Sequence, residues 1–201
     1  MSDLAPFPMF HGTSTLYTDS FRQGYLPGPW PYRDEAIALL QRSLRNLTAA
    51  SAEVEPWILE TVAQHSGASN WQHGQIYVTP SRFTALKYAE TGGRNGGELL
   101  CMCSLVLNRL EAENPATALR YRSEAPSLER FLVGAGSPML VVFDELKLSE
   151  LEAERDKLCV DDLMNQLNTA DPMLFDLLGQ QCNFRLKPGT GTVSRIEKLG
   201  E

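Results

Sequence analysis

The segment Glu98–Leu107, with the sequence ELLCMCSLVL, constrains the fold of this chain more than any other part. Its residues are apolar on both faces of an extended chain. A strand that is apolar on both faces lies inside a sheet and is covered on both sides. The segment therefore predicts a central strand over 98–107, with the core of the molecule packed around it.

Short apolar segments alternate with helical patterns in the rest of the chain, without βαβ regularity. Leu40, Leu44 and Leu47 recur at the spacings of a helix. Helices are predicted over 34–48, 53–65 and 81–90, a charged helix over 149–158, and one or two amphipathic helices over 160–179. Strands are predicted over 74–80 and 138–146, and a hairpin over 184–199. This pattern is typical of a single α+β domain over 1–201, with a helical insertion at about 34–65.

Composition and charge narrow the class of protein. The net charge of −7 favours solubility and disfavours non-specific binding to nucleic acid. No apolar run approaches the ~20 residues of a membrane helix, and the first ten residues do not resemble a signal peptide. The four cysteines lack metal-binding spacing. We therefore expect reduced, mostly buried thiols, no metal, no membrane contact, and a cytoplasmic protein or one delivered into a host cytosol.

Three short motifs stand out in the first half of the chain. The first is His11-Gly12-Thr13. The second is GQIY at 74–77, which ends in Tyr77 on a predicted strand. The third is Tyr88, eleven residues after Tyr77, on the helix that follows.

In this order the motifs resemble the ADP-ribosyltransferase superfamily, in the branch of diphtheria-type toxins and poly(ADP-ribose) polymerases. The sequence FHGTS at 10–14, the stretch GQIYVTPSRFTALKYA at 74–89 and the segment FRQGYLPG at 21–28 carry the resemblance. It implies a split, strongly bent β-sheet core and NAD as the substrate. It also implies a nicotinamide ring between two tyrosine rings, with a histidine that hydrogen-bonds a ribose hydroxyl.

The resemblance also implies which residues of this chain form the site. The predicted catalytic residues are His11, Tyr77 and Glu145. The predicted NAD-binding residues are His11, Gly12, Thr13, Tyr77, Ser81, Thr84 and Tyr88. Gly12 would let the backbone approach the carboxamide, because glycine has no side chain in the way.

The third catalytic position is the least defined part of this prediction. The family carries a glutamate at the start of a late strand, and this chain has Met139 where the strand 138–146 would place it. Glu145, after the same strand, is the first candidate. Gln181, ahead of the predicted strand near Phe184, is the second.

The function that follows is NAD-dependent mono-ADP-ribosylation of a macromolecule. The acidic charge favours a protein acceptor over nucleic acid. The small size favours a bacterial toxin or effector, which implies a neutralising partner protein. The insertion at 34–65 is a candidate lid or target-docking surface. Two alternatives stay open, an NAD glycohydrolase and a catalytically inactive NAD-binding or protein-interaction module.

Overall fold

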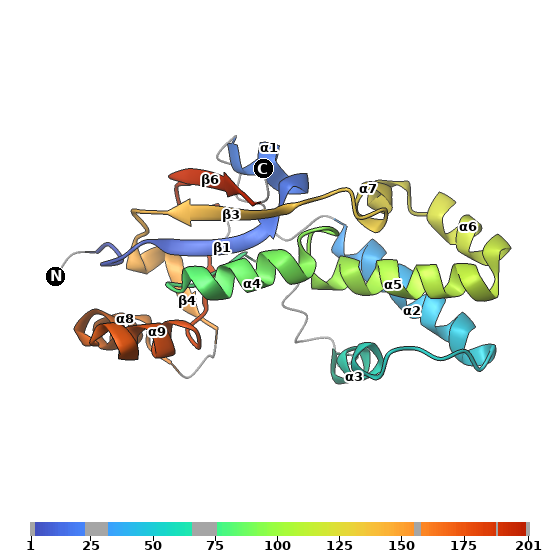
Figure 1. Cartoon of the computed structure of the whole chain (residues 1–201), viewed down its shortest axis with the longest axis horizontal. Helices are drawn as coiled ribbons and strands as arrows, with labels where there is room; N and C mark the ends of the chain where they lie inside the picture. Colours follow the sequence, from blue (N-terminus) through green and yellow to red (C-terminus); the bar gives the residue numbers. More distant parts are fainter. Residues whose placement is uncertain (1–2, 23–31, 66–75, 155–157, 188, 200–201) are drawn as a thin grey trace.

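The chain forms an elongated molecule with strands in one half and helices in the other (Figure 1). The computed structural model describes residues 3–22, 32–65, 76–154, 158–187 and 189–199. The strands are β1 (Met9–Ser14), β2 (Ile76–Val78), β3 (Pro138–Phe143), β4 (Leu151–Ala153), β5 (Phe184–Leu186) and β6 (Arg195–Lys198). The helices are α1 (Thr18–Arg22), α2 (Arg33–Ala49), α3 (Pro56–His65), α4 (Arg82–Gly92), α5 (Glu98–Glu113), α6 (Pro115–Ser123), α7 (Glu129–Leu132), α8 (Val160–Thr169) and α9 (Pro172–Gly179). Short 3-10 turns occupy Thr15–Tyr17, Pro126–Leu128 and Leu148–Glu150.

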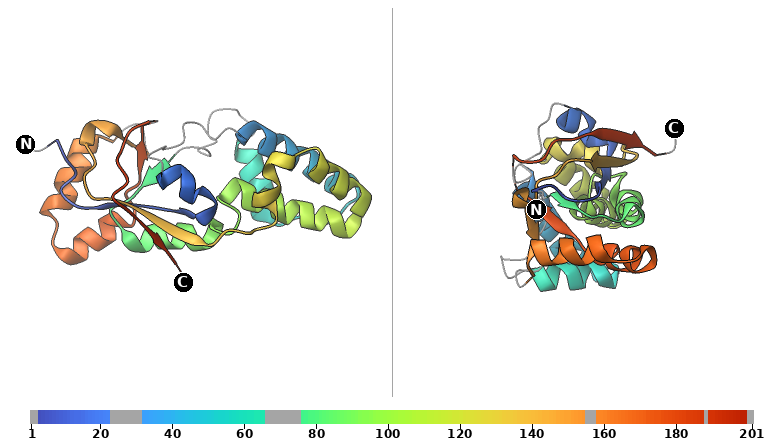
Figure 2. Two further views of the ribbon diagram at one scale, coloured as in Figure 1. Left: turned by 90° about the horizontal axis from the view of Figure 1, so that it is seen from above. Right: turned by 90° about the vertical axis from the view of Figure 1, so that its left-hand side faces the viewer.

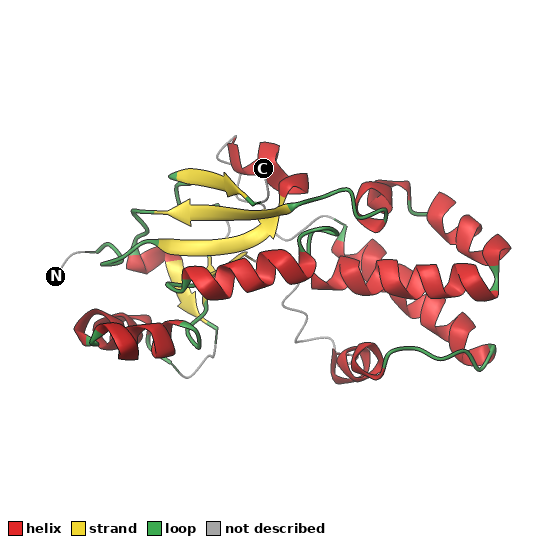
Figure 3. Cartoon of the chain, in the orientation of Figure 1, coloured by secondary structure: helices red, strands yellow, loops and turns green. Residues whose placement is uncertain are grey.

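Two small antiparallel sheets form the β lobe, together with α1, α4, α8 and α9 (Figure 3). The first sheet has the strand order β1-β3-β6 and the second has the order β2-β5-β4. One isolated antiparallel bridge, Phe10 to Thr79, joins β1 to the end of β2. Both of its hydrogen bonds are well formed, at 2.8 and 2.9 Å between N and O. The mixed α+β class predicted from the sequence is therefore present.

The helical lobe consists of α2, α3, α5, α6 and α7 (Figure 1). Its core is a separate cluster of buried apolar side chains, largely leucines from α2 and α5. The Cys103 Sγ donates a hydrogen bond to the carbonyl of Ala36, at 3.3 Å, and ties α5 to α2. The predicted insertion at 34–65 is thus only part of this lobe, because 98–132 contributes the other helices.

The central strand predicted over 98–107 is wrong, because this segment begins the long helix α5. Leu99, Leu100, Cys103, Leu107 and Leu110 are all buried at helical spacing. The helix packs against α2 on one side and against α6 and α7 elsewhere, so it is apolar on most of its surface. A short run that is apolar on every side fits a buried helix as well as a buried strand.

Other predicted elements are confirmed or corrected. The helices predicted over 34–48, 53–65 and 81–90 are α2, α3 and α4, and 160–179 forms α8 and α9. The strand predicted over 138–146 is β3. The hairpin predicted over 184–199 is wrong, because β5 joins the second sheet and β6 joins the first. The charged helix predicted over 149–158 is also wrong, because β4 occupies its first half.

All four cysteines are free thiols. Cys103 is buried, Cys101 and Cys182 are partly buried, and Cys159 is exposed. Burial raises the pKa of Cys103 to about 12, and it raises the pKa values of Cys101 and Cys182 as well. These three thiols are therefore protonated and unreactive at neutral pH.

Tyr17 contacts both lobes. Its ring lies 5.7 Å from the ring of Phe131 in α7, and its hydroxyl donates to the carbonyl of Gly96 at 3.0 Å. Gly96 has φ of +84°, and a Cβ there would come within 3.0 Å of the Tyr17 hydroxyl and of the Phe131 ring. The glycine-rich turn between α4 and α5 therefore closes tightly around Tyr17. In the described ranges, no helix has both the length and the apolar character needed to cross a membrane.

Candidate functional site

The two faces of β1 contact different parts of the β lobe. Side chains alternate along a strand, so His11 and Thr13 share one face and Gly12 lies on the other. Met9 and its partner Phe143 belong to the core between the two sheets. His11 and Thr13 are therefore on the side of β1 that faces this core, while Gly12 faces α4.

His11 connects β1 to β2 through its side chain. Its Nδ1 lies 2.8 Å from the backbone carbonyl oxygen of Tyr77, and its ring lies 5.8 Å from that of Phe21. Burial lowers the pKa of His11 to about 4, and the hydrogen bond to Tyr77 opposes that shift only in part. His11 is therefore neutral at pH 7.

The tautomer of His11 follows from this contact. A carbonyl oxygen can only accept, so Nδ1 must carry the proton of the neutral ring. The other ring nitrogen, Nε2, then carries no proton and can only accept a hydrogen bond. It can therefore bind a hydroxyl donor, but not an anion or a carbonyl oxygen.

Gly12 permits the close approach of α4 to β1. A Cβ on Gly12 would lie 1.8 Å from the carbonyl oxygen of Ala85 and 2.9 Å from the backbone N of Ala89. The predicted reason for a glycine here was access of a ligand to the backbone. The structure adds a packing reason that holds with or without a ligand.

The backbone of Gly12 also has a defined direction. Phe10 directs its N–H and C=O to Thr79 of β2, away from β3. Backbone groups two residues apart on a strand point to the same edge. The N–H and C=O of Gly12 therefore point to the edge where the two sheets diverge, just beyond the Phe10–Thr79 bridge.

Tyr77 lies in a row of polar side chains across the second sheet. Ile76 and Val78 point into the core, so the Tyr77 side chain is on the opposite face. Tyr77 pairs directly with Arg185 on β5, and Arg185 pairs with Glu152 on β4. Three residues in direct register share one face of the sheet.

Two charged side chains, Arg185 and Glu154, influence the Tyr77 hydroxyl. The Arg185 Nε donates to Glu152 Oε2 at 2.7 Å. Burial raises the pKa of Tyr77, the positive charge of Arg185 lowers it, and the negative charge of Glu154 raises it. Arg185, Glu152 and Glu154 were not among the predicted site residues. Each stands on or beside a three-residue strand, and no sequence signal sets the register that brings them to Tyr77.

The predicted NAD-binding residues at α4 have side chains with different surroundings. Ser81 is the N-cap of the helix, because its Oγ accepts from the backbone N of Thr84 at 3.1 Å. The Thr84 side chain is buried. Tyr88 lies one turn later and is 58% exposed. The enclosure of a nicotinamide ring between Tyr77 and Tyr88 stays a prediction.

The two candidates for the third catalytic position follow β3 and α9. Val141 is the partner of His11 on β3, and Glu145 follows four residues later as an exposed side chain. The strand ends at Phe143, which at ~3.3 Å per residue is already ~7 Å from Val141 along the strand direction, and Glu145 lies in the bend beyond it. Gln181 is exposed in the turn between α9 and β5. The structure does not bring Glu145 to His11, whereas Gln181 is two residues from Gly179, whose carbonyl accepts from Thr79 Oγ1.

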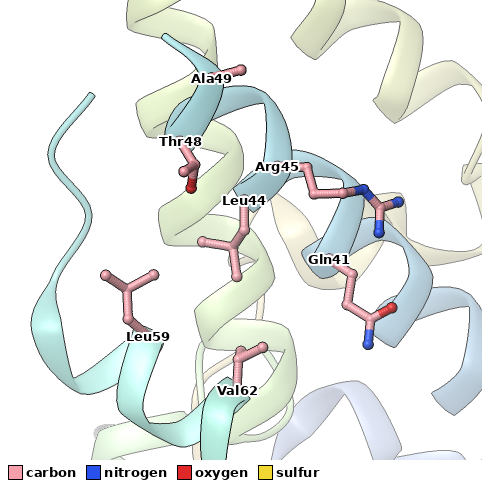
Figure 4. Close-up of a pocket in the computed structure, with 7 residues that line it drawn as sticks. All are labelled: Gln41, Leu44, Arg45, Thr48, Ala49, Leu59 and Val62. Carbon is pink, nitrogen blue, oxygen red and sulfur yellow. The ribbon is translucent and has the colours of Figure 1, made fainter. Parts of the chain in front are cut away.

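An open apolar groove of about 660 Å³ lies in the helical lobe, between α2 and α3 (Figure 4). Leu44, Leu59 and Val62 point into it from the two helices (Figure 4). Gln41, Arg45, Thr48 and Ala49 complete its lining. The groove is on the segment 34–65, where a docking surface was expected, and it is remote in the fold from β1 and β2.

Part of the predicted site lies outside the described residues. This applies to Gly74 and Gln75 of the GQIY motif and to residues 23–28 of the segment FRQGYLPG. Within the described part of the chain, no group of three or more His, Cys, Asp or Glu side chains is arranged to hold a metal ion. Comparisons of the chain with known protein families, with curated proteins and with solved structures find no match.

Proposed function

We propose that this protein is a mono-ADP-ribosyltransferase that transfers ADP-ribose from NAD to a macromolecular acceptor, with a protein as the favoured acceptor. The observation that carries the proposal is the contact between the H-G-T strand and the G-x-Y strand. His11 Nδ1 lies 2.8 Å from the Tyr77 carbonyl oxygen, next to the Phe10–Thr79 bridge between two diverging sheets. Such a divided sheet is what the ADP-ribosyltransferase core requires.

The groups at this point are suited to NAD. Neutral His11 offers Nε2 as an acceptor for a ribose hydroxyl. Gly12 offers one N–H and one C=O in the same direction, which matches the C=O and NH₂ of a carboxamide. Thr13 lies on the same face of β1 as His11 and offers a hydroxyl. These three residues would hold the dinucleotide without a metal ligand.

The transfer breaks the bond between the ribose C1′ and the nicotinamide nitrogen. Nicotinamide leaves as a neutral molecule with the bonding electron pair, and the acceptor then bonds to C1′ and releases its proton. Positive charge that develops on the ribose is stabilised by a fixed anion. We add Glu154 to Glu145 and Gln181 as a candidate for this position, since its charge acts on Tyr77.

The activity itself is tested by incubation with NAD, followed by measurement of free nicotinamide. Release that requires added cell extract supports transfer, and mass spectrometry should then find one ADP-ribose unit on a protein. Release without extract indicates an NAD glycohydrolase. Binding of NAD without release indicates an inactive module, which is the second candidate because Glu145 stands apart from His11.

Substitutions test the residues. His11→Asn should lower the rate of nicotinamide release by about 10²–10³, the usual effect of losing one stabilising polar group. Glu145→Gln, Gln181→Ala and Glu154→Gln, compared at saturating NAD, identify the third position by the largest loss.

Substitutions on α4 test whether Tyr88 stacks on the nicotinamide ring. Tyr88→Ala should weaken NAD binding by about tenfold, in the range of one stacking contact. Lys87→Ala, at an exposed neighbouring position on α4, is the matched control. Equal affinity in both variants would show that Tyr88 is a surface residue without a part in binding.

A further inference from the structure

Helix α9 exposes an unusual amount of apolar surface. Met173 is 82% exposed, Leu177 is 56% exposed and Leu174 is 41% exposed. Leu177 lies beside both of the others, because it is four residues after Met173 and three residues after Leu174 on the helix. We call this group the α9 patch. Helix α9 stands at the end of the β lobe remote from the helical lobe (Figure 1; Figure 2, right).

The apolar surface of α9 is wider than its packing requires. The inner side of the helix is already occupied, since Phe175 packs edge-on against Phe7 at 5.1 Å and Gly179 contacts Pro80 and Ser81. The α9 patch lies on the side away from these contacts. A surface helix is expected to be polar there, and an apolar patch in its place marks an interaction site.

The charged residues of α8, α9 and the connection between them have a single sign. Between residues 158 and 184 the chain has no Lys or Arg and has four aspartates, Asp161, Asp162, Asp171 and Asp176. All four are exposed on α8, α9 or the connection between them. A partner that covers the patch must therefore complement negative charge with Lys or Arg, and an anionic membrane surface would be repelled.

We propose that the α9 patch is a docking surface for a basic amphipathic helix of another protein. The partner helix would lay apolar side chains on Met173, Leu174 and Leu177, and its flanking Lys or Arg side chains would meet the four aspartates. Helix-on-helix recognition uses anchors at this spacing. The proposal rests on exposure and charge, and it stands whether or not the protein turns over NAD.

The test uses the intact protein and two synthetic peptides of about 15 residues, long enough to form a helix on a surface. Both carry the same leucine face. One has lysines beside that face and the other has glutamates. The lysine peptide should bind by isothermal titration calorimetry, and its affinity should fall as salt is raised. The glutamate peptide should not bind.

Variants assign the binding to the patch. Met173→Asp with Leu177→Asp should weaken binding of the lysine peptide by about tenfold or more. Leu119→Asp, at a 71% exposed apolar position on α6, is the control and should leave binding unchanged. Both substitutions are at exposed positions, and circular dichroism checks that the fold is retained.

Three results would overturn the proposal. They are equal binding of the two peptides, an equal loss in the Leu119→Asp control, and binding of the protein to phosphatidylglycerol vesicles without binding of the lysine peptide. The last result would identify the patch as a membrane contact.

Discussion

Both lobes have a buried apolar core, but the β lobe is built from short strands and the helical lobe from longer helices. In the β lobe, single polar contacts join segments far apart in the sequence, as in His11 to Tyr77 and Thr79 Oγ1 to the carbonyl of Gly179. In the helical lobe, leucines of long helices fill one continuous core. A hydrogen bond made by a single residue requires exact placement of its two atoms, whereas the stability of a leucine core depends on the total volume of its side chains. The two lobes should therefore respond differently to substitution.

The largest expected effect is at Gly12. Gly12→Val places a Cβ where the carbonyl of Ala85 lies 1.8 Å away, so α4 must move off β1. We expect a loss of about 4 kcal/mol or more in unfolding free energy, measured by urea denaturation. The control is Gly189→Ala, where φ is +74° and no atom lies within 4 Å. It should cost about 1 kcal/mol through backbone strain alone.

The next largest expected effect is in the helical lobe, where two substitutions test whether residues 98–107 form a helix or a strand. Leu107→Ala empties a buried position and should cost about 2–5 kcal/mol. Leu105→Ala, at a 39% exposed position, should cost less than about 1 kcal/mol. On a strand, residues two apart share a face, so the two variants would lose similar stability. Equal losses would contradict the helix.

A smaller effect is the pH dependence that His11 gives to the β lobe. The pKa of His11 is about 4 in the folded protein and 6.5 in the unfolded chain. Between these values the unfolded chain binds more protons, so stability falls as pH decreases from 6.5 to 4. The loss should reach about 2 kcal/mol by pH 5.

The matched variant for this effect is His11→Asn, which removes the titrating group. Its unfolding free energy should lack this component between pH 7 and pH 5. Parallel curves for the two proteins would mean that His11 titrates normally in the fold.

The smallest effects concern ion pairs. Arg109 and Glu113 on α5 are 2.9 Å apart with both side chains substantially exposed. Arg109→Ala should change stability by at most about 0.5 kcal/mol, with no change in nicotinamide release. Arg185→Ala in the β lobe should also change stability little, but it should alter NAD binding because Arg185 is paired with Tyr77. Equal effects of both variants on NAD binding would remove the distinction between the lobes.

The helices predicted by residue spacing are present. Leu40, Leu44 and Leu47 of α2 are buried as their spacing indicates, and Ser81 caps α4. The secondary-structure prediction failed where one sequence pattern fits two different structures. The run 98–107 is buried on most sides, so periodicity alone did not separate a helix from a strand. The hairpin over 184–199 failed because turn residues do not show which sheet a strand will join.

The sequence by itself determined the amphipathic helices, the position of Tyr77 on a strand, and the mixed class of the fold. These follow from spacings of three and four residues and from local preferences, which act over short distances along the chain. Only the tertiary structure decided that His11 hydrogen-bonds the Tyr77 carbonyl, that Arg185 and Glu152 line up with Tyr77, and that Glu145 lies apart. The reason is that strands of three residues carry too little pattern to set register, so their pairing is fixed by packing of the whole β lobe.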